Sequence, residues 1–130
     1  MDKLQEEKYR NDLKNLENSL RKELSETSKI LENNKSFDSQ QSVEIFVQLL
    51  SKQKQINETA YNQYDKLSEK FIEECTDDVR QKKTEKYVLT LLVDEVNEQF
   101  SFYKSIQEKL DRAITELNKF LEEEREINKN

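Results

Sequence analysis

The sequence contains no glycine, proline, histidine or tryptophan among its 130 residues. Glycine allows positive φ angles and proline removes an amide donor, so these two residues interrupt regular backbone most strongly. Ordinary usage, about 7% glycine and 5% proline, would place roughly fifteen of them in a chain of this length. Their absence indicates either long helices or a disordered chain, and the spacing of the apolar residues distinguishes the two.

The missing residues also exclude most catalytic and metal-binding chemistry. Without histidine the chain has no imidazole base and no histidine ligand for a metal. The single cysteine, Cys75, can form neither an internal disulfide nor a structural zinc site, and it is typical of a reducing compartment. Without glycine there is no phosphate-binding loop. We therefore expect a protein that is not an enzyme and that uses no cofactor and no metal.

Charge and hydropathy make two kinds of partner unfavourable. The net charge of −6 opposes nucleic-acid binding, which needs clustered lysine and arginine. The longest nearly apolar run covers only residues 88–93, whereas a bilayer is spanned by roughly 20 residues. We expect neither nucleic-acid binding nor membrane insertion.

Apolar residues recur at every third or fourth position over most of the chain, which is the period of an amphipathic helix. In the first segment the stripe runs through Tyr9, Leu13, Leu16, Leu20 and Leu24. Similar stripes follow in two later segments, and Gln53 is a polar break in the second. The spacing predicts helices over residues 2–33, 39–73 and 79–127, the third being the longest.

Polar residues mark the two predicted connections. Asn, Asp and Ser gather before residue 39, and Asp38 with Gln41 resembles a capping box that opens the second helix. The acidic stretch at residues 73–78 suits the start of the third helix, where the helix dipole favours negative charge. Residues 1–130 are thus predicted to form one all-α domain, an elongated antiparallel three-helix bundle with coiled-coil-like packing.

The third helix carries more apolar residues than one stripe requires. At about 100° per residue, Val88 and Ile106 mark the centre of its core face, and Phe102 and Phe100 lie to opposite sides of that centre. Either this section is the most enclosed part of the bundle, or it lines an aromatic groove that accepts an apolar peptide anchor. The burial of Phe100 and Phe102 distinguishes these interpretations.

Residues 100–110, FSFYKSIQEKL, resemble the segment TKFYNxLTxIL in the V domain of ALIX and its fungal Bro-domain counterparts, and share Phe102, Tyr103 and Leu110 with it. Residues 50–53 are similar to that family's LKKQ, and residues 2–31 to its LDEVKKEREGLENDL helix. The resemblance implies the three-helix arm of a V-shaped domain. Family members are cytoplasmic, non-catalytic ESCRT adaptors, recruited to endosomes for multivesicular-body sorting.

The same resemblance implies partners and a site. The family's arm binds YPxL-type peptide motifs in partner proteins, and V domains also bind ubiquitin. Phe102 matches the family's peptide-binding phenylalanine, and Lys109 stands where the family has isoleucine. Leu20 and Leu24 are the nearest matches to the part of the pocket that comes from the first helix. The expected peptide-binding residues are Phe102, Tyr103, Ile106, Leu20, Leu24 and Lys109.

A structural bundle or coiled-coil spacer that mediates protein–protein assembly is the alternative function. Peptide binding at Phe102 favours the adaptor, and concentration-dependent assembly without peptide or ubiquitin binding favours the spacer. The oligomeric state stays open at this point, because the extra length of the third helix could pair with a neighbour.

Overall fold

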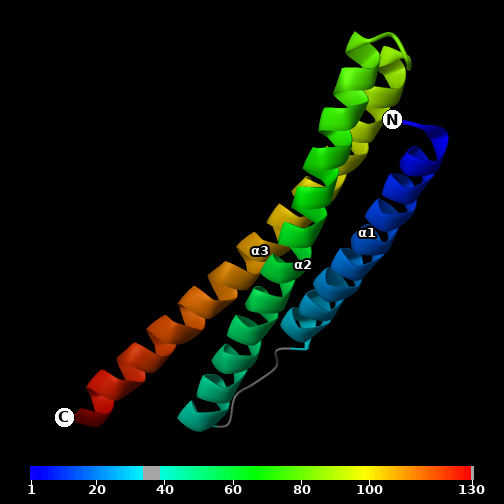
Figure 1. Ribbon diagram of the computed structural model, residues 1–130. Helices are drawn as coiled ribbons and strands as arrows, with labels where there is room; N and C mark the ends of the chain where they lie inside the picture. The colour runs from blue at the N-terminus through cyan, green and yellow to red at the C-terminus, as the bar shows by residue number, and fades with distance from the viewer. Residues whose placement is uncertain (34–38, 130) are drawn as a thin grey trace.

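The computed structural model describes the backbone of residues 1–33 and 39–129, which contain three α-helices and no strand. Helix α1 spans Lys3–Glu32, α2 spans Gln40–Arg80 and α3 spans Lys86–Lys129. The helices pack side by side in alternating directions, and α3 is the longest with 44 residues (Figure 1). The predicted all-α three-helix bundle is confirmed.

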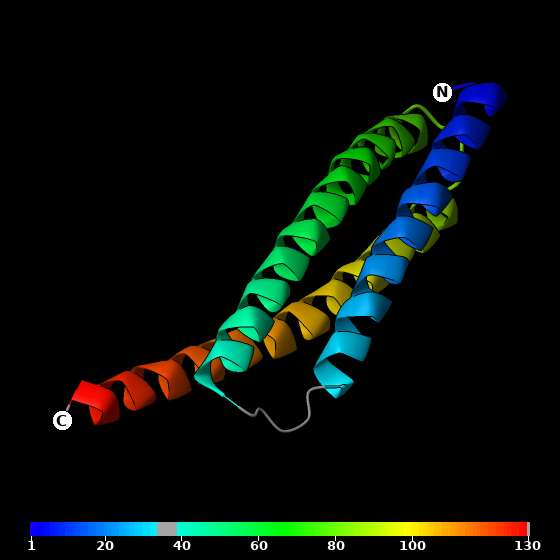
Figure 2. The same cartoon turned by 90° about the horizontal axis from the view of Figure 1, so that it is seen from below.

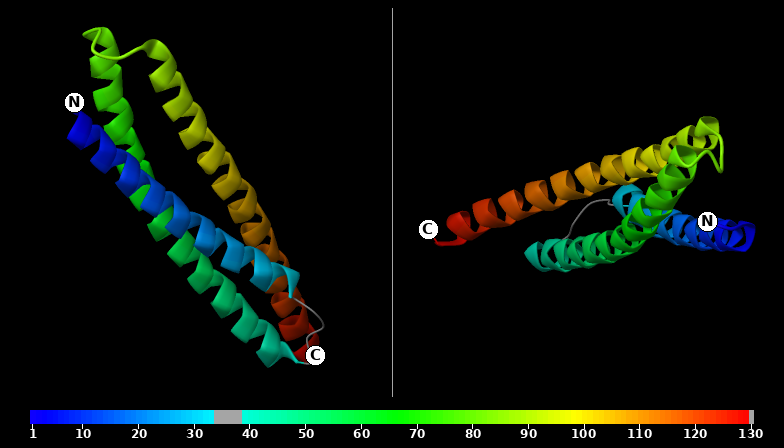
Figure 3. Two further views of the ribbon diagram at one scale, coloured as in Figure 1. Left: turned by 90° about the vertical axis from the view of Figure 1, so that its right-hand side faces the viewer. Right: turned by 45° about the horizontal axis from the view of Figure 1, so that its top comes forward.

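The bundle is an elongated rod whose two ends differ. Near the α2–α3 connection all three helices are present, and the N-terminus lies at that end (Figure 1). Helix α1 ends before it reaches the first turns of α2, so only α2 and α3 form the opposite end of the rod (Figures 1 and 3). The last turns of α3 extend beyond the start of α2 (Figure 2). The extra length of the third helix therefore lies at the C-terminal end.

Helix α2 opens with a capping box one residue after the predicted one. The Ser39 hydroxyl accepts from the Ser42 amide at 3.2 Å, and the Ser42 hydroxyl accepts from the Ser39 amide at 3.2 Å. Each serine satisfies an amide that has no partner within the helix. Asp38, the predicted cap, lies outside the described residues.

The predicted break at residues 73–78 is wrong, because α2 continues through this stretch to Arg80. Cys75 and Asp78 are buried, so this turn of α2 packs into the bundle instead of forming a connection. The Asp78 carboxylate accepts a hydrogen bond from the Met1 ammonium at 3.0 Å. Glu74 of the same stretch accepts from Tyr9 of α1 at 2.8 Å, so the acidic side chains hold the N-terminal segment and α1 against α2 and do not begin the third helix.

The connection that follows α2 makes a tight turn without glycine. Lys82 has φ 59°, in the left-handed region. Its amide donates to the Val79 carbonyl at 3.0 Å, and the Lys83 amide donates to the Asp78 carbonyl at 2.8 Å. This pair of bonds is a Schellman motif, which usually has glycine at the left-handed position. A lysine there costs roughly 1 kcal/mol.

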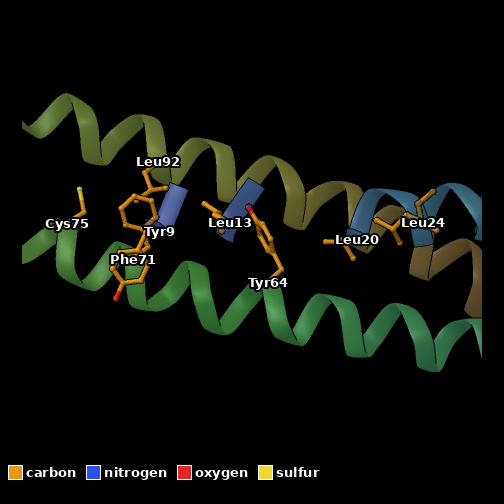
Figure 4. Packing of buried hydrophobic residues seen from close by; sticks show 9 residues of the cluster. Tyr9, Leu13, Leu20, Leu24, Tyr64, Phe71, Cys75 and Leu92 are labelled. Atoms are coloured by element: carbon orange, nitrogen blue, oxygen red, sulfur yellow. The ribbon is translucent and has the colours of Figure 1, made fainter. Parts of the chain in front are cut away.

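The apolar core combines side chains from all three helices. It includes a stacked pair, Tyr9 of α1 and Phe71 of α2, with ring centroids 5.1 Å apart (Figure 4). Burial, together with the hydrogen bond that the Tyr9 hydroxyl donates to Glu74 at 2.8 Å, raises the pKa of Tyr9 to about 12. The buried cluster comprises Tyr9, Leu13, Leu20, Leu24, Tyr64, Phe71, Cys75, Leu92 and Ile106.

A layer of polar side chains interrupts this core where Gln53 breaks the apolar stripe. Asn57 of α2 is fully buried and donates to Thr27 of α1 at 2.9 Å and to Gln107 of α3 at 3.2 Å. Gln53 donates to Asn57 at 3.2 Å. Because buried polar groups are costly without partners, this network favours one alignment of the three helices.

Candidate functional site

The aromatic section of α3 is not simply the most enclosed part of the bundle. The side chains of Phe100 and Phe102 remain 45% and 38% exposed, whereas Ile106 between the two flanks is buried. The two phenylalanines lie on opposite sides of the core face, so each belongs to a different helix–helix boundary. The section therefore offers two separate aromatic flanks.

The first flank lies between α3 and α2. The rings of Tyr61 and Tyr103 stack with centroids 4.1 Å apart, and the Phe100 ring lies 5.9 Å from Tyr61. Burial of the phenol, with Glu58 nearby, raises the pKa of Tyr103 to about 12. Beside these rings is a hollow of about 280 Å³, lined by Tyr61, Tyr64, Asp65, Ser68, Val96, Asn97 and Phe100.

The second flank lies between α3 and α1 and has a cation at its centre. The Arg21 guanidinium lies 5.1 Å from the centroid of the Phe102 ring, within the range of a cation–π contact. The same side chain approaches Glu17, with 3.7 Å between Arg21 Nε and Glu17 Oε1. Arg21 thus connects an exposed aromatic ring to a buried carboxylate.

The six predicted site residues separate into a buried and an accessible set. Leu20 and Leu24 are 0% exposed and pack in the core cluster with Ile106, so they support the flank from beneath and do not line an open groove. Phe102 and Lys109 are exposed. Tyr103 is half-buried, on the α2 flank.

Two residues of these flanks were missed by the sequence analysis. Tyr61 follows Ala60 in the stripe of α2, and Arg21 follows Leu20 in the stripe of α1. A position next to a stripe lies at the edge of the buried face, where the long side chains of Tyr and Arg can reach a neighbouring helix. That position was the only signal in the sequence.

A larger hollow of about 500 Å³ lies between α1 and α2. Most of its lining residues are of polar type and none is aromatic: Ser19, Glu23, Lys52, Gln55, Ile56, Thr59, Ala60 and Gln63. It therefore offers no aromatic side chain, the residue type in which binding hot spots are enriched. We therefore place the candidate site on the aromatic flanks.

Other chemistry finds little support in the described residues. They contain no group of three or more His, Cys, Asp or Glu side chains that could hold a metal ion. Burial raises the pKa of the Cys75 thiol, which disfavours the reactive thiolate. None of the described helices is both long enough and apolar enough to cross a membrane.

Comparison with known proteins gives no relative. No protein-family profile, curated protein or solved structure matches this chain. The resemblance to the V domain therefore rests on the residues themselves and stays a prediction.

Proposed function

We propose that this bundle is a peptide-binding arm of a non-catalytic ESCRT adaptor, and that a YPxL-type motif docks beside Phe102. The observation that carries the proposal is the exposed Phe102 ring, which a guanidinium covers on its α1 side. A soluble protein gains nothing in stability from leaving such a ring in water. An exposed ring under a partly exposed cation is suited to exchange that cation for a ligand.

Docking on this flank has a simple physical basis. The Arg21 side chain is 42% exposed, so it can swing toward solvent and free a face of the Phe102 ring. The tyrosine of the motif would stack there, and its proline keeps the peptide extended and reduces the entropy lost on binding. With so few anchors we expect micromolar affinity, about −8 kcal/mol.

The cellular role follows from the same proposal. Recruitment of the cytoplasmic adaptor to endosomes would depend on motif-bearing partners, and ubiquitin is the second ligand that the resemblance implies. We assign no residues to a ubiquitin contact. A separate titration with ubiquitin tests that part.

The test is an NMR titration of the ¹⁵N-labelled chain with a YPxL peptide. We expect Phe102→Asp to abolish binding and Phe100→Asp to retain it, because the two rings are similarly exposed on the same helix but face different flanks. Circular dichroism of both variants checks that they fold. Normal binding by folded Phe102→Asp excludes this site, and selective loss in Phe100→Asp assigns the anchor to the hollow beside Tyr61.

A structural spacer is the second candidate, and the two-helix end of the rod favours it. Exposed apolar side chains occur there on both helices: Ile45 and Leu49 on α2, and Phe120 and Ile127 on α3. Sedimentation equilibrium over a range of concentrations distinguishes the candidates. A spacer assembles and binds neither ligand, whereas the adaptor arm binds peptide in whatever oligomeric state it adopts.

A further inference from the structure

Three polar atoms in the interior have no hydrogen-bond partner among the described residues: Glu17 Oε2 of α1, Tyr64 Oη of α2 and Gln99 Oε1 of α3. All three side chains are more than nine-tenths buried. Glu17 and Gln99 are in direct contact, since Gln99 Nε2 donates to Glu17 Oε1 at 3.0 Å. Tyr64 extends from α2 with its hydroxyl end beside Leu13 of α1 (Figure 4). Burial and then the negative charge of Glu17 raise the pKa of its phenol.

The hydrogen-bonding capacity of this group is unbalanced. Glu17 Oε2 and Gln99 Oε1 can only accept, and the Tyr64 hydroxyl supplies a single donor. The Tyr64 hydroxyl bonds to neither of them, so both acceptors lack a donor, and a buried acceptor without a donor is costly. A proton held at this place would supply the missing donor.

Glu95 of α3 is in position to carry that proton. It lies one helical turn before Gln99, so its half-buried side chain is on the face of α3 that meets Glu17. Two ionised carboxylates cannot hydrogen-bond each other, whereas a protonated one donates to its neighbour. We propose that Glu95 and Glu17 form a proton-binding site, in which the protonated Glu95 carboxyl donates to Glu17 Oε2.

The groups around the pair come from all three helices. On α1, Lys14 Nζ lies 3.9 Å and Arg21 Nε 3.7 Å from Glu17 Oε1, and the charge of Arg10 also reaches Glu95. On α2 the facing group is the Tyr64 phenol, and on α3 it is the Gln99 amide. These cations stand mainly at the other oxygen of Glu17, so they leave Oε2 without a donor.

Burial of Glu95, followed by its hydrogen bond and charge repulsion with Glu17, raises its pKa above the ordinary 4.5, against a smaller opposing effect of Lys14 and Arg10. Because the pKa of Glu95 is raised in the folded state, the stabilisation of the fold by the protonated carboxyl is fully present below the pKa of Glu95 in the unfolded chain. This stabilisation is lost as the pH rises through the pKa of Glu95 in the folded protein. The bundle should therefore hold α1 against α3 more firmly in mildly acidic solution.

The test is a ¹³C NMR titration of the glutamate side-chain carboxyls in the full chain. We expect the Glu95 midpoint to lie above 4.5. In Glu17→Gln, whose amide oxygen can still accept from Gln99, we expect that midpoint to fall. A Glu95 midpoint at or below 4.5 overturns the proposal, as does a raised midpoint that Glu17→Gln leaves unchanged, because burial alone would then be its cause.

Urea unfolding gives a second readout. Glu95→Gln keeps a donor permanently beside Glu17, so its urea midpoint should exceed that of the wild type at pH 8 and equal it at pH 4. Glu98→Gln is the matched control, since Glu98 is an exposed glutamate on the same helix. The proposal is contradicted if the urea midpoints of the wild type and Glu95→Gln differ by the same amount at pH 4 and at pH 8.

Discussion

Gln99 of α3 donates its side-chain amide to Glu17 of α1 at 3.0 Å in the protein interior, although the two residues are 82 positions apart. The bond joins the first and the third helix directly. Glu17 also approaches Arg21, whose guanidinium covers the exposed ring of Phe102. One arginine therefore lies between the buried polar group and the candidate peptide site.

Removing the Arg21 guanidinium should strengthen peptide binding, if the peptide has to displace it. A cation–π contact at such a site is worth about 0.5–1 kcal/mol, so we expect Arg21→Ala to bind a YPxL peptide about two- to five-fold more tightly. Arg10→Ala is the control, because Arg10 lies 5.5 Å from the Phe71 ring in an equivalent arrangement away from the site. Isothermal titration calorimetry measures both variants. Weaker binding by Arg21→Ala would mean that the arginine contacts the ligand.

Glycine at position 82 should stabilise the bundle. The left-handed backbone of Lys82 costs a side-chain-bearing residue roughly 1 kcal/mol that glycine does not incur, so Lys82→Gly should gain up to about that amount. Lys83→Gly should give no gain, because Lys83 is not at a positive φ angle. The free energy of unfolding in urea measures both, and an equal effect at the two positions contradicts the assignment of strain to Lys82.

Loss of the Asn57 side chain should be strongly destabilising. Asn57→Ala removes the shared partner of Thr27, Gln53 and Gln107 in the buried polar layer, and we expect it to cost about 2–4 kcal/mol. Asn62→Ala, at an exposed position of the same helix, should change stability by less than about 0.5 kcal/mol. Urea unfolding compares the two. Similar small losses would show that the layer contributes little.

Deprotonation of the Tyr9 phenol should contribute to the loss of stability of the bundle at alkaline pH. Its pKa of about 12 lies above the ordinary 10.0, so the unfolded chain loses the phenolic proton first. The stabilisation from neutral Tyr9 is full below pH 10 and declines as the pH rises toward 12. Tyr9→Phe should therefore lose less stability than the wild type between pH 9 and 11, as measured by circular dichroism in urea. Identical losses would exclude a contribution from Tyr9.

Much of the fold could be predicted from local spacing, but the second connection and the composition of the site could not. The stripe through Tyr9, Leu13 and Leu20 correctly predicts the buried face of α1. The acidic stretch that ends at Asp78 looked like a connection, because its burial depends on contacts with α1 that spacing does not reveal. Leu20 and Leu24 were expected in the peptide site from the resemblance to the V domain, but both lie in the core, because spacing places them on the buried face of α1.

The sequence by itself determined long amphipathic helices, because without glycine and proline the backbone has few interruptions and apolar residues recur every third or fourth position. It also placed the aromatic section on the third helix. Only the tertiary structure decided that Phe102 faces Arg21 while Phe100 faces Tyr61, and that Glu17 meets Gln99. Helical periodicity depends on neighbours three and four residues apart, whereas these contacts depend on the crossing and the relative alignment of separate helices.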